Sequence, residues 1–261
     1  MSAIITLTTD FGFGSPYVAA MKGVMLGMHP AVRFVDLSHA VGPQNVREGA
    51  VLLAETTPWF PAGTVHVAVI DPGVGTARKL LYARIGDQQY LVPDNGLLSL
   101  LAKRRKPDRI VELTNSEYWL PEVSRTFHGR DILAPVAAQV SLGLEPERLG
   151  SAMHKLLTLD WPDARRDGNR VEGDVQWIDR FGNAITNIPA SLLSEGEKSS
   201  AVRIRCAGCE ITGLTQAYGQ RQQGELAALV GSSGFLEIAV VNGSAAEKLN
   251  VQVGGPVVVE F

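Results

Sequence analysis

Residues 4–36 read IITLTTDFGFGSPYVAAMKGVMLGMHPAVRFVD. A short β-rich apolar run at 4–8 is followed by a helical pattern at 17–28 and by a second β-rich run at 32–36. A strand, a helix and a strand in this order favour two parallel strands joined by a crossover helix. This stretch therefore predicts the beginning of an α/β sheet.

The same alternation continues through the first 160 residues. Further strands are expected at 64–70, 80–85 and 90–92, and further helices at 47–57, 96–102 and 131–142. Alternating strands and helices are typical of a sheet covered by helices. We therefore expect an N-terminal α/β domain over residues 1–160 with a mostly parallel central sheet.

The rest of the chain has a different pattern. Residues 161–170 are polar, contain a Pro and a Gly, and show no apolar period, which is typical of a linker. After them come short strand-like runs separated by Gly- and Ser-rich turns, at 172–178, 200–205, 226–230, 235–241 and 256–260. We expect a smaller C-terminal domain over 171–261, antiparallel and similar to a β-barrel.

Composition narrows the class of protein. The 261 residues are 45% hydrophobic and 20% charged, as in ordinary globular proteins, and the formal net charge of −3 leaves no basic surplus for nucleic acid. No apolar run approaches the roughly 20 residues of a membrane helix. The start, MSAIITLTTDFG, has neither the basic head nor the apolar core of a signal peptide, so we expect a cytoplasmic protein without a membrane partner.

The two cysteines, Cys206 and Cys209, are separated by two residues. Such a pair can be redox-active or form half of a zinc site, but no second Cys or His pair completes four ligands. We favour a turn between two strands with free thiols.

Polar side chains after the predicted strands are the first candidates for a site, because ligands of open α/β sheets collect at the carboxyl ends of parallel strands. Asp10 follows the first strand, and its carboxylate could accept hydrogen bonds from neighbouring sugar hydroxyls or cap the next helix. Asp71 opens the loop DPGVG, where it could face a ligand or form an Asx-type turn. The loop 93–96, PDNG, is a third candidate.

Two basic groups could act with Asp71. Arg78 could pair with it or lie solvated at the rim. His128 stands in the segment TFHGRD, just before a predicted helix, where a lone His is structural or catalytic. The other histidines show no metal-ligand spacing, so we expect no metal and no cofactor.

The segment WIDRFGN in the second domain contains an acid, an aromatic ring and an amide. Asp179 could bind an ammonium group, Phe181 could stack on a base and Asn183 could bind a purine edge, or the segment could be a hairpin turn. The segment GSSG at 231–234 offers hydroxyls and backbone N–H groups for a carboxylate, or is itself a turn.

Five motifs, TDFG, DPGVG, PDNG, FHGRD and DRFGN, occur in an order that resembles the S-adenosylmethionine hydroxide adenosyltransferases. These enzymes are related to the fluorinase and chlorinase, which attack the same substrate with halide. The resemblance spans nearly the whole chain. It implies an α/β domain joined to a β-barrel-like domain, and a homotrimer with active sites between subunits.

The resemblance also implies roles for individual residues. In the family an Asp, an Arg and a His position the attacking water, and Asp71, Arg78 and His128 match them. The halogenating relatives lack this trio, so its presence favours water over halide. Asp10 matches the residue that holds both ribose hydroxyls.

The remaining matches lie in the second domain. Asp179 and Ser232 match positions that bind the amino and carboxylate ends of methionine. Phe181 and Asn183 match positions facing adenine, as do backbone groups near Asn242. Ser233 and Val240 depart from the halogenating relatives, which carry arginines at these positions.

We therefore expect hydrolysis of S-adenosylmethionine to adenosine and methionine by attack of water or hydroxide at the ribose C5′. The sulfonium is a good leaving group, so alignment of the nucleophile is the main requirement. The alternatives are a halide-dependent adenosyltransferase, a non-catalytic sensor of S-adenosylmethionine or adenosine, and a metal-dependent hydrolase.

Overall fold

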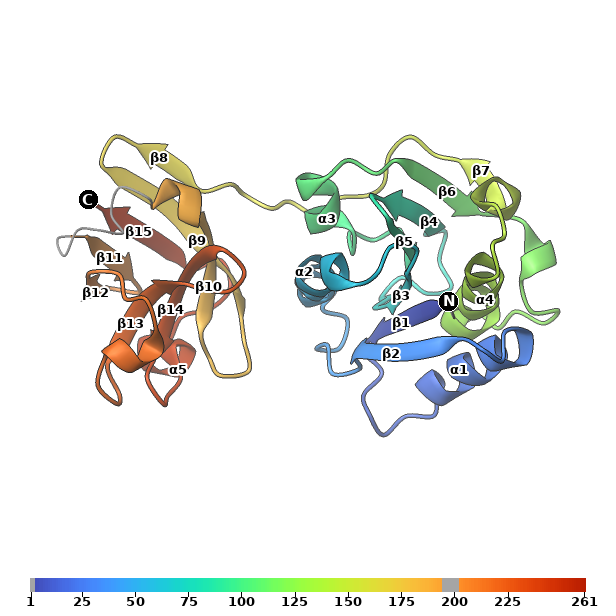
Figure 1. Cartoon of the computed structure of the whole chain (residues 1–261), viewed down its shortest axis with the longest axis horizontal. Helices are drawn as coiled ribbons and strands as arrows, with labels where there is room; N and C mark the ends of the chain where they lie inside the picture. The colour runs from blue at the N-terminus through green and yellow to red at the C-terminus, as the bar shows by residue number, and fades with distance from the viewer. Residues whose placement is uncertain (1–2, 194–201) are drawn as a thin grey trace. The chain divides into compact units, whose positions relative to one another are not determined.

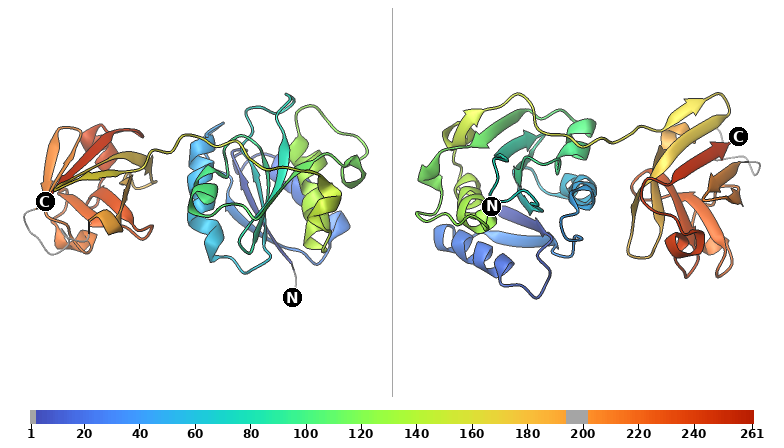
Figure 2. Two further views of the ribbon diagram at one scale, coloured as in Figure 1. Left: turned by 90° about the horizontal axis from the view of Figure 1, so that it is seen from above. Right: turned by 180° about the vertical axis from the view of Figure 1, so that it is seen from behind.

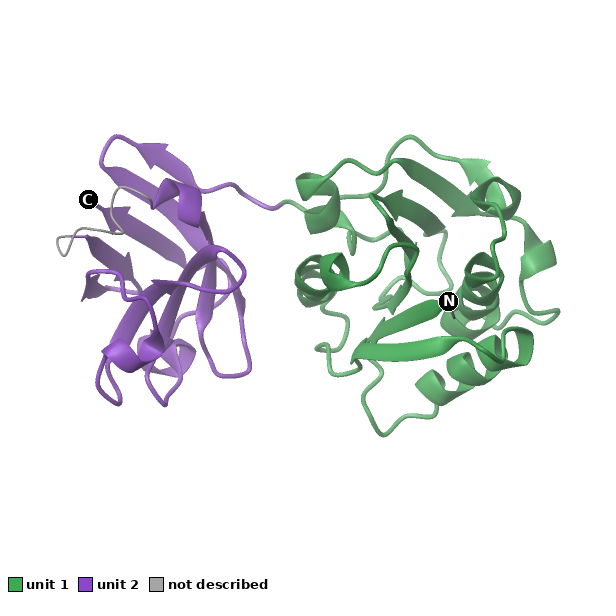
Figure 3. Cartoon of the chain, viewed as in Figure 1, with its two compact units in different colours: residues 1–160 green, residues 161–261 purple. Residues whose placement is uncertain are grey.

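The computed structural model describes residues 3–193 and 202–261. The chain divides into two compact units, Met1–Asp160 and Trp161–Phe261 (Figure 3). Residues 200 and 201 of the strand expected at 200–205 lie outside the described residues.

Unit 1 is built on a seven-stranded sheet with the order β2-β1-β3-β5-β4-β6-β7. Its strands are β1 (Ile4–Thr9), β2 (Arg33–Ser38), β3 (Val65–Val69), β4 (Leu80–Ile85), β5 (Gln88–Pro93), β6 (Arg109–Leu113) and β7 (Gly150–Ala152). The first four strands in the sheet order pair in parallel, and β4, β6 and β7 add antiparallel pairs. Because β1 and β3 are central, both are almost wholly buried and consist largely of apolar or Thr side chains.

Helices cover both faces of this sheet (Figures 1 and 2). They are α1 (Tyr17–Met28), α2 (Val46–Thr56), α3 (Ser99–Arg104) and α4 (Ala134–Ser141), the last preceded by one π-helical turn at Gly129–Leu133. Contacts pair α1 with α4 and α2 with α3, one pair to each face. The side chain of Asn45 caps α2 by accepting a hydrogen bond from the Glu48 N–H. A continuous apolar core links the sheet to α1 and α4.

Unit 2 is an antiparallel sheet that curls into a nearly closed barrel. The strands follow the path β12-β11-β15-β9-β10-β14-β13, and β13 contacts β12 again. They are β9 (Arg170–Ile178), β10 (Ala184–Pro189), β11 (Arg203–Cys206), β12 (Cys209–Thr212), β13 (Leu226–Val230), β14 (Phe235–Val240) and β15 (Pro256–Glu260), with the short β8 (Arg165–Asp167) paired to β9 and the helix α5 (Ala245–Leu249) after β14. Its apolar core is formed by the inward side chains of these strands.

The predicted fold class is confirmed: a mixed, partly parallel α/β sheet is followed by a barrel-like antiparallel sheet. Cys206 and Cys209 face each other across the β11–β12 turn as free thiols, as predicted. Three strands were missed, β6, β7 and β10, whereas β12 is the second strand of the predicted cysteine turn, and β8 lies inside the stretch interpreted as a linker. Of the helices that the structure describes, none is long and apolar enough to span a bilayer.

Candidate active site

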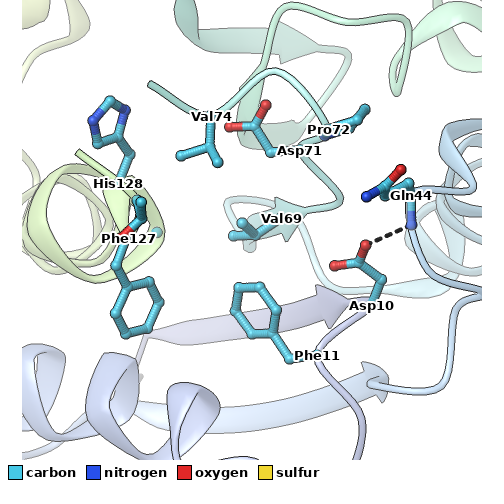
Figure 4. A pocket seen from close by; sticks show the side chains of 11 residues that line it. Asp10, Phe11, Gln44, Val69, Asp71, Pro72, Val74, Phe127 and His128 are labelled. Carbon is cyan, nitrogen blue, oxygen red and sulfur yellow. Dashed lines mark hydrogen bonds between the residues drawn. The ribbon is translucent and has the colours of Figure 1, made fainter. Parts of the chain in front are cut away.

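The site in unit 1 forms where the parallel strands β1 and β3 end. Thr9 and Val69 are partners in the parallel ladder, so Asp10 and Asp71, which follow them closely, come to the same edge of the sheet. Together with His128 they line a cavity of about 260 Å³ (Figure 4). The structure thus brings together three predicted site residues from distant parts of the sequence.

Asp10 does not cap the helix that follows it. Helix α1 begins at Tyr17 with Pro16 at its N-cap position. The Asp10 carboxylate instead lies at the cavity, where its Oδ2 accepts a hydrogen bond of 2.8 Å from the backbone N–H of Gln44 (Figure 4). The helix-cap alternative is therefore wrong for this residue.

Arg78 joins Asp71 to His128. Its Nε and Nη2 lie 2.8 and 2.7 Å from Oδ2 of Asp71, and the same Nη2 lies 2.8 Å from Nδ1 of His128. The side chains of Arg78 and Asp71 are only 11% and 6% exposed, so this ion pair is shielded from water. Arg78 does not lie solvated at the rim.

This arrangement fixes the protonation of His128. A guanidinium can only donate, so Nδ1 accepts and the proton of the neutral ring is on Nε2. Burial of the ring, and then the neighbouring charge of Arg78, lower the pKa of His128 below its usual value. His128 is therefore a neutral imidazole at neutral pH, and its one N–H donor also makes a hydrogen bond to the backbone of Ser124.

The second oxygen of Asp71 is buried without a protein donor. Both contacts from Arg78 go to Oδ2, and Oδ1 receives no hydrogen bond from the residues described. An unsatisfied buried carboxylate oxygen is costly, so it marks a position where an outside donor is expected. Oδ1 is thus suited to accept a hydrogen bond from a molecule in the cavity.

The loop that carries His128 is held from behind by Asp131. This carboxylate is fully buried and accepts hydrogen bonds from the backbone N–H of Ser124 and from Nε of Arg130. Burial opposes ionisation, but these hydrogen bonds prevail and lower the pKa of Asp131. The π-helical turn begins directly after His128, and such turns recur at functional sites. The sequence motif FHGRD contains Asp131, but its supporting role was not predicted.

An aromatic cluster forms the apolar side of the site. Phe11, Tyr17 and Phe127 meet edge to face, with ring centroids 5.1 to 5.9 Å apart. Phe11 and Phe127 also line the cavity. The cluster therefore connects the loop after β1 to the loop that carries His128.

The loop DPGVG packs tightly against the His128 loop at Gly75. This residue has φ of +79°, and a Cβ atom placed on it would lie 2.7 Å from the backbone oxygen of Arg125. Only glycine fits this backbone conformation and this approach without displacement. The contact holds the DPGVG loop against the segment that precedes His128.

The third candidate loop, 93–96, is not part of the cavity. Asp94 accepts a hydrogen bond of 2.7 Å from the backbone N–H of Leu157, and Asn95 donates one of 2.8 Å to the carbonyl of Ile70. The loop therefore supports the end of β3 instead of facing a ligand.

In unit 2 the segment WIDRFGN forms the turn between β9 and β10. Asp179 accepts from the backbone N–H groups of Phe181 and Asn183 and from Nδ2 of Asn183, at 2.8 to 2.9 Å. Asn183 is buried and its amide nitrogen is engaged inside the turn, whereas the ring of Phe181 is 79% exposed. Phe181 is thus the group of this turn that is free to stack on a ligand.

Ser232 and Asn242 lie at opposite ends of β14. Ser232 is exposed in the turn before the strand, and Asn242 is exposed after it with φ of +55°. Six residues of extended chain separate them by about 20 Å. The turn at Gly182 lies beside the Asn242 end, because the N–H of Ala246 donates to the Gly182 carbonyl. The unit-2 residues therefore form an extended set, not a compact cluster.

No metal centre is found in the part of the chain that the structure describes. Within residues 3–193 and 202–261, no three His, Cys, Asp or Glu side chains come together in a way that could hold an ion. The polar side chains that line the cavity include Asp10, Gln44, Asp71, Thr126 and His128, and Arg78 is bonded to two of them.

Two family models match the chain, the SAM hydroxide adenosyltransferase N-terminal domain over residues 5–150 and the C-terminal domain over 173–258. An (R)-S-adenosyl-L-methionine hydrolase of Salinispora tropica is 39% identical, covering 96% of this chain and 95% of the relative. An (R)-S-adenosyl-L-methionine hydrolase of Thermus thermophilus is 38% identical, covering 95% of this chain and 96% of the relative.

A more distant relative and a solved structure are also similar to nearly the whole chain. A fluorinase of Nocardia brasiliensis is 27% identical, covering 96% of this chain and 94% of the relative. The crystal structure of an uncharacterized conserved protein from Thermotoga maritima, 37% identical, superposes with a TM-score of 0.93 over 98% of this chain and 100% of that one. The chain belongs to the SAM hydroxide adenosyltransferase family.

Proposed function

We propose that the protein hydrolyses S-adenosylmethionine to adenosine and methionine by attack of water at the ribose C5′. The observation that carries this proposal is the pairing of a free, buried Oδ1 on Asp71 with a neutral His128, both held by Arg78. The relatives at 38 to 39% identity are (R)-S-adenosyl-L-methionine hydrolases, which supports the same reaction.

The two groups can bind one water from two sides. Oδ1 of Asp71 accepts a hydrogen bond from the water, and Nε2–H of His128, which it shares with the backbone of Ser124, donates a hydrogen bond to the water oxygen. A water held in this way presents a lone pair to C5′, and alignment of reacting groups can contribute about 7 to 11 kcal/mol. His128 acts here as a donor and not as the base, because its basic nitrogen Nδ1 is occupied by Arg78.

The bond changes balance without a cofactor. The oxygen–C5′ bond forms as the C5′–sulfur bond breaks, and the bonding pair passes to sulfur, which becomes the neutral thioether of methionine. The proton lost by the water passes to Oδ1 of Asp71 and then to solvent. Asp10 accepts hydrogen bonds from the ribose hydroxyls and so fixes the ring that carries C5′.

We propose that the rest of the substrate is bound by the unit-2 residues. Asp179 and Ser232 bind the amino and carboxylate ends of methionine, while Phe181, Asn183 and the backbone near Asn242 face adenine. The cavity of about 260 Å³ is below the roughly 300 to 1,000 Å³ of typical ligand pockets, so groups outside it must contribute. We also propose a homotrimer with active sites between subunits and a cytoplasmic location, where the free thiols of Cys206 and Cys209 would stay reduced.

The proposed reaction is tested with purified protein and S-adenosylmethionine in water labelled with ¹⁸O. We expect the label in the 5′ oxygen of adenosine and not in methionine, unchanged by chelator and without 5′-halo-adenosine in chloride or fluoride. Mass spectrometry measures the position of the label, the effect of chelator and the presence of any halogenated product. Substrate that binds but stays intact would instead favour a sensor, and a halogenated product would favour the halide-dependent alternative.

The neutral state of His128 predicts a pH profile. The pKa of His128 is lowered, so kcat/KM should stay constant as the pH falls through about 6.5 and decline only at lower pH, where protonation of Nδ1 breaks the bond from Arg78. His128→Asn keeps an acceptor for Arg78 without titrating in this range. The variant should not show the decline of kcat/KM at low pH that His128 causes. Its kcat/KM should be about 10²- to 10⁴-fold lower than that of the wild type.

The control is Asp87→Asn, an exposed carboxylate in the β4–β5 turn, which should match the wild type throughout. A midpoint at or above pH 6.5 that disappears in His128→Asn would contradict a neutral, buried ring.

The contact at Gly75 predicts that its substitution affects catalysis. In Gly75→Ala the Cβ atom would push the DPGVG loop from Arg125 and separate Asp71 from His128, so kcat should fall at least about 10-fold. Gly63→Ala is the matched control, because Gly63 has φ of +81° and open space around its Cβ position. Thermal unfolding should show a loss of about 1 kcal/mol from the left-handed backbone in both variants, and a further loss in Gly75→Ala from the contact with Arg125. Equal kcat in the two variants would exclude a positioning role for this contact.

Sites between subunits predict complementation. Asp71→Asn and Asp179→Asn should each be inactive alone, but mixed trimers should regain part of the activity, because some sites would combine intact residues from two subunits. Native mass spectrometry measures mixing and turnover measures recovery. Mixed trimers without recovered activity would place both residues of each site in one subunit.

A further inference from the structure

Gln44 has an unusual backbone at the edge of the cavity. Its φ is +62°, in the left-handed region that side chains with a Cβ rarely adopt. Such conformations persist where the surroundings fix them, and they gather at binding and catalytic sites. Nothing in the sequence marks this position, because Gln is neither a turn residue nor part of the five motifs.

The neighbouring residues hold Gln44 in this conformation. Asn45 caps α2 through the N–H of Glu48, and Oε2 of Glu48 accepts hydrogen bonds from the Gly42 N–H and from Nδ2 of Asn45. The N–H of Gly12 donates to the carbonyl of His39, which ties this loop to the one that carries Asp10. The loop is therefore fixed at both ends.

The fixed backbone of Gln44 positions the carboxylate of Asp10. The N–H of Gln44 donates to Oδ2 of Asp10 at 2.8 Å, which leaves the other oxygen, Oδ1, outside this bond. The side chain of Gln44 is exposed and lines the cavity beside Asp10 (Figure 4). Gln44 thus contributes a backbone donor to Asp10 and an amide to the cavity.

The two side chains are chemically complementary. A carboxylate only accepts hydrogen bonds, whereas an amide both donates and accepts. Two adjacent hydroxyls offer protons, which Asp10 can accept, and oxygen lone pairs, which need a donor. An acid with a neighbouring amide therefore binds a vicinal diol better than an acid alone.

We infer that Gln44 is a specificity residue for the ribose of the substrate: its N–H positions Asp10, and its side-chain amide hydrogen-bonds a ribose hydroxyl. This inference rests on the proposed function, since it takes the ribose of S-adenosylmethionine as the ligand. It adds a residue that distinguishes ribose from deoxyribose.

The test compares Gln44→Leu and wild type on S-adenosylmethionine and on its 2′-deoxy and 3′-deoxy analogues. Leucine keeps the size of the side chain and the backbone N–H but removes the amide. For S-adenosylmethionine we expect KM to rise about 3- to 10-fold with kcat little changed, as for one lost hydrogen bond. With one of the two analogues, wild type and Gln44→Leu should have the same KM, because the hydroxyl that Gln44 contacts is already absent.

Further variants separate the amide from the backbone. Gln44→Asn keeps an amide on a residue that tolerates the left-handed region, and should recover part of the lost affinity. Gln252→Leu, at an exposed glutamine of unit 2, should behave as wild type on all three substrates. An unchanged KM in Gln44→Leu, or an equal rise with all three substrates, would overturn the inference.

The inference can fail separately from the proposed function. Turnover by the wild type tests the function first. If the wild type does not turn over, calorimetric binding of adenosine, 2′-deoxyadenosine and 3′-deoxyadenosine to wild type and Gln44→Leu gives the same comparison from dissociation constants. Equal weakening of all three nucleosides would then overturn the role of Gln44.

Discussion

The site depends on one interaction: the guanidinium of Arg78 lies between Asp71 and His128 and hydrogen-bonds both. Because all its polar hydrogens donate, it orients Oδ2 of the carboxylate on one side and fixes Nδ1 of the imidazole as an acceptor on the other. The burial of Arg78 and Asp71 makes removal of either partner costly, because the other charge would be left buried and unpaired. One side chain therefore sets the orientation of Asp71 and the tautomer of His128.

The fold serves to bring these three groups together. Asp71 follows a buried central strand, while His128 stands at the start of a π-helical turn, 50 residues beyond Arg78. The two loops meet at Gly75 and Arg125, and Asp131 holds the second loop from behind through Ser124. A parallel ladder between β1 and β3 then places Asp10 beside them. The geometry of the site is thus determined by backbone contacts as much as by the side chains that face the ligand.

Much of this could be predicted from the sequence, since it depends on local patterns. The β-α-β alternation predicts the parallel part of the sheet, and the rule that ligands collect at the ends of such strands points to Asp10 and Asp71. The strands that were missed are short, as in β7, or lie in mixed patterns, as in β10, where pairing with neighbours decides the structure.

What the sequence could not predict depends on contacts between distant residues. The sequence does not show that Asp94 and Asn95 support Leu157 and Ile70 instead of a ligand. Nor does it mark Gln44, whose backbone conformation is imposed by the loop around it.

The same geometry bears on the choice between water and halide. Asp71 and Arg78 cancel in charge and His128 is neutral, so the trio offers an anion no net positive charge. Oδ1 of Asp71 is a buried anionic acceptor, which repels a halide but favours a molecule that can donate a proton. Water meets both requirements of this pair, since it donates to the carboxylate and accepts from the imidazole. A site built for halide would need donors on every side of the ion. In this chain a carboxylate occupies one of those sides, and this is the physical reason to expect hydrolysis.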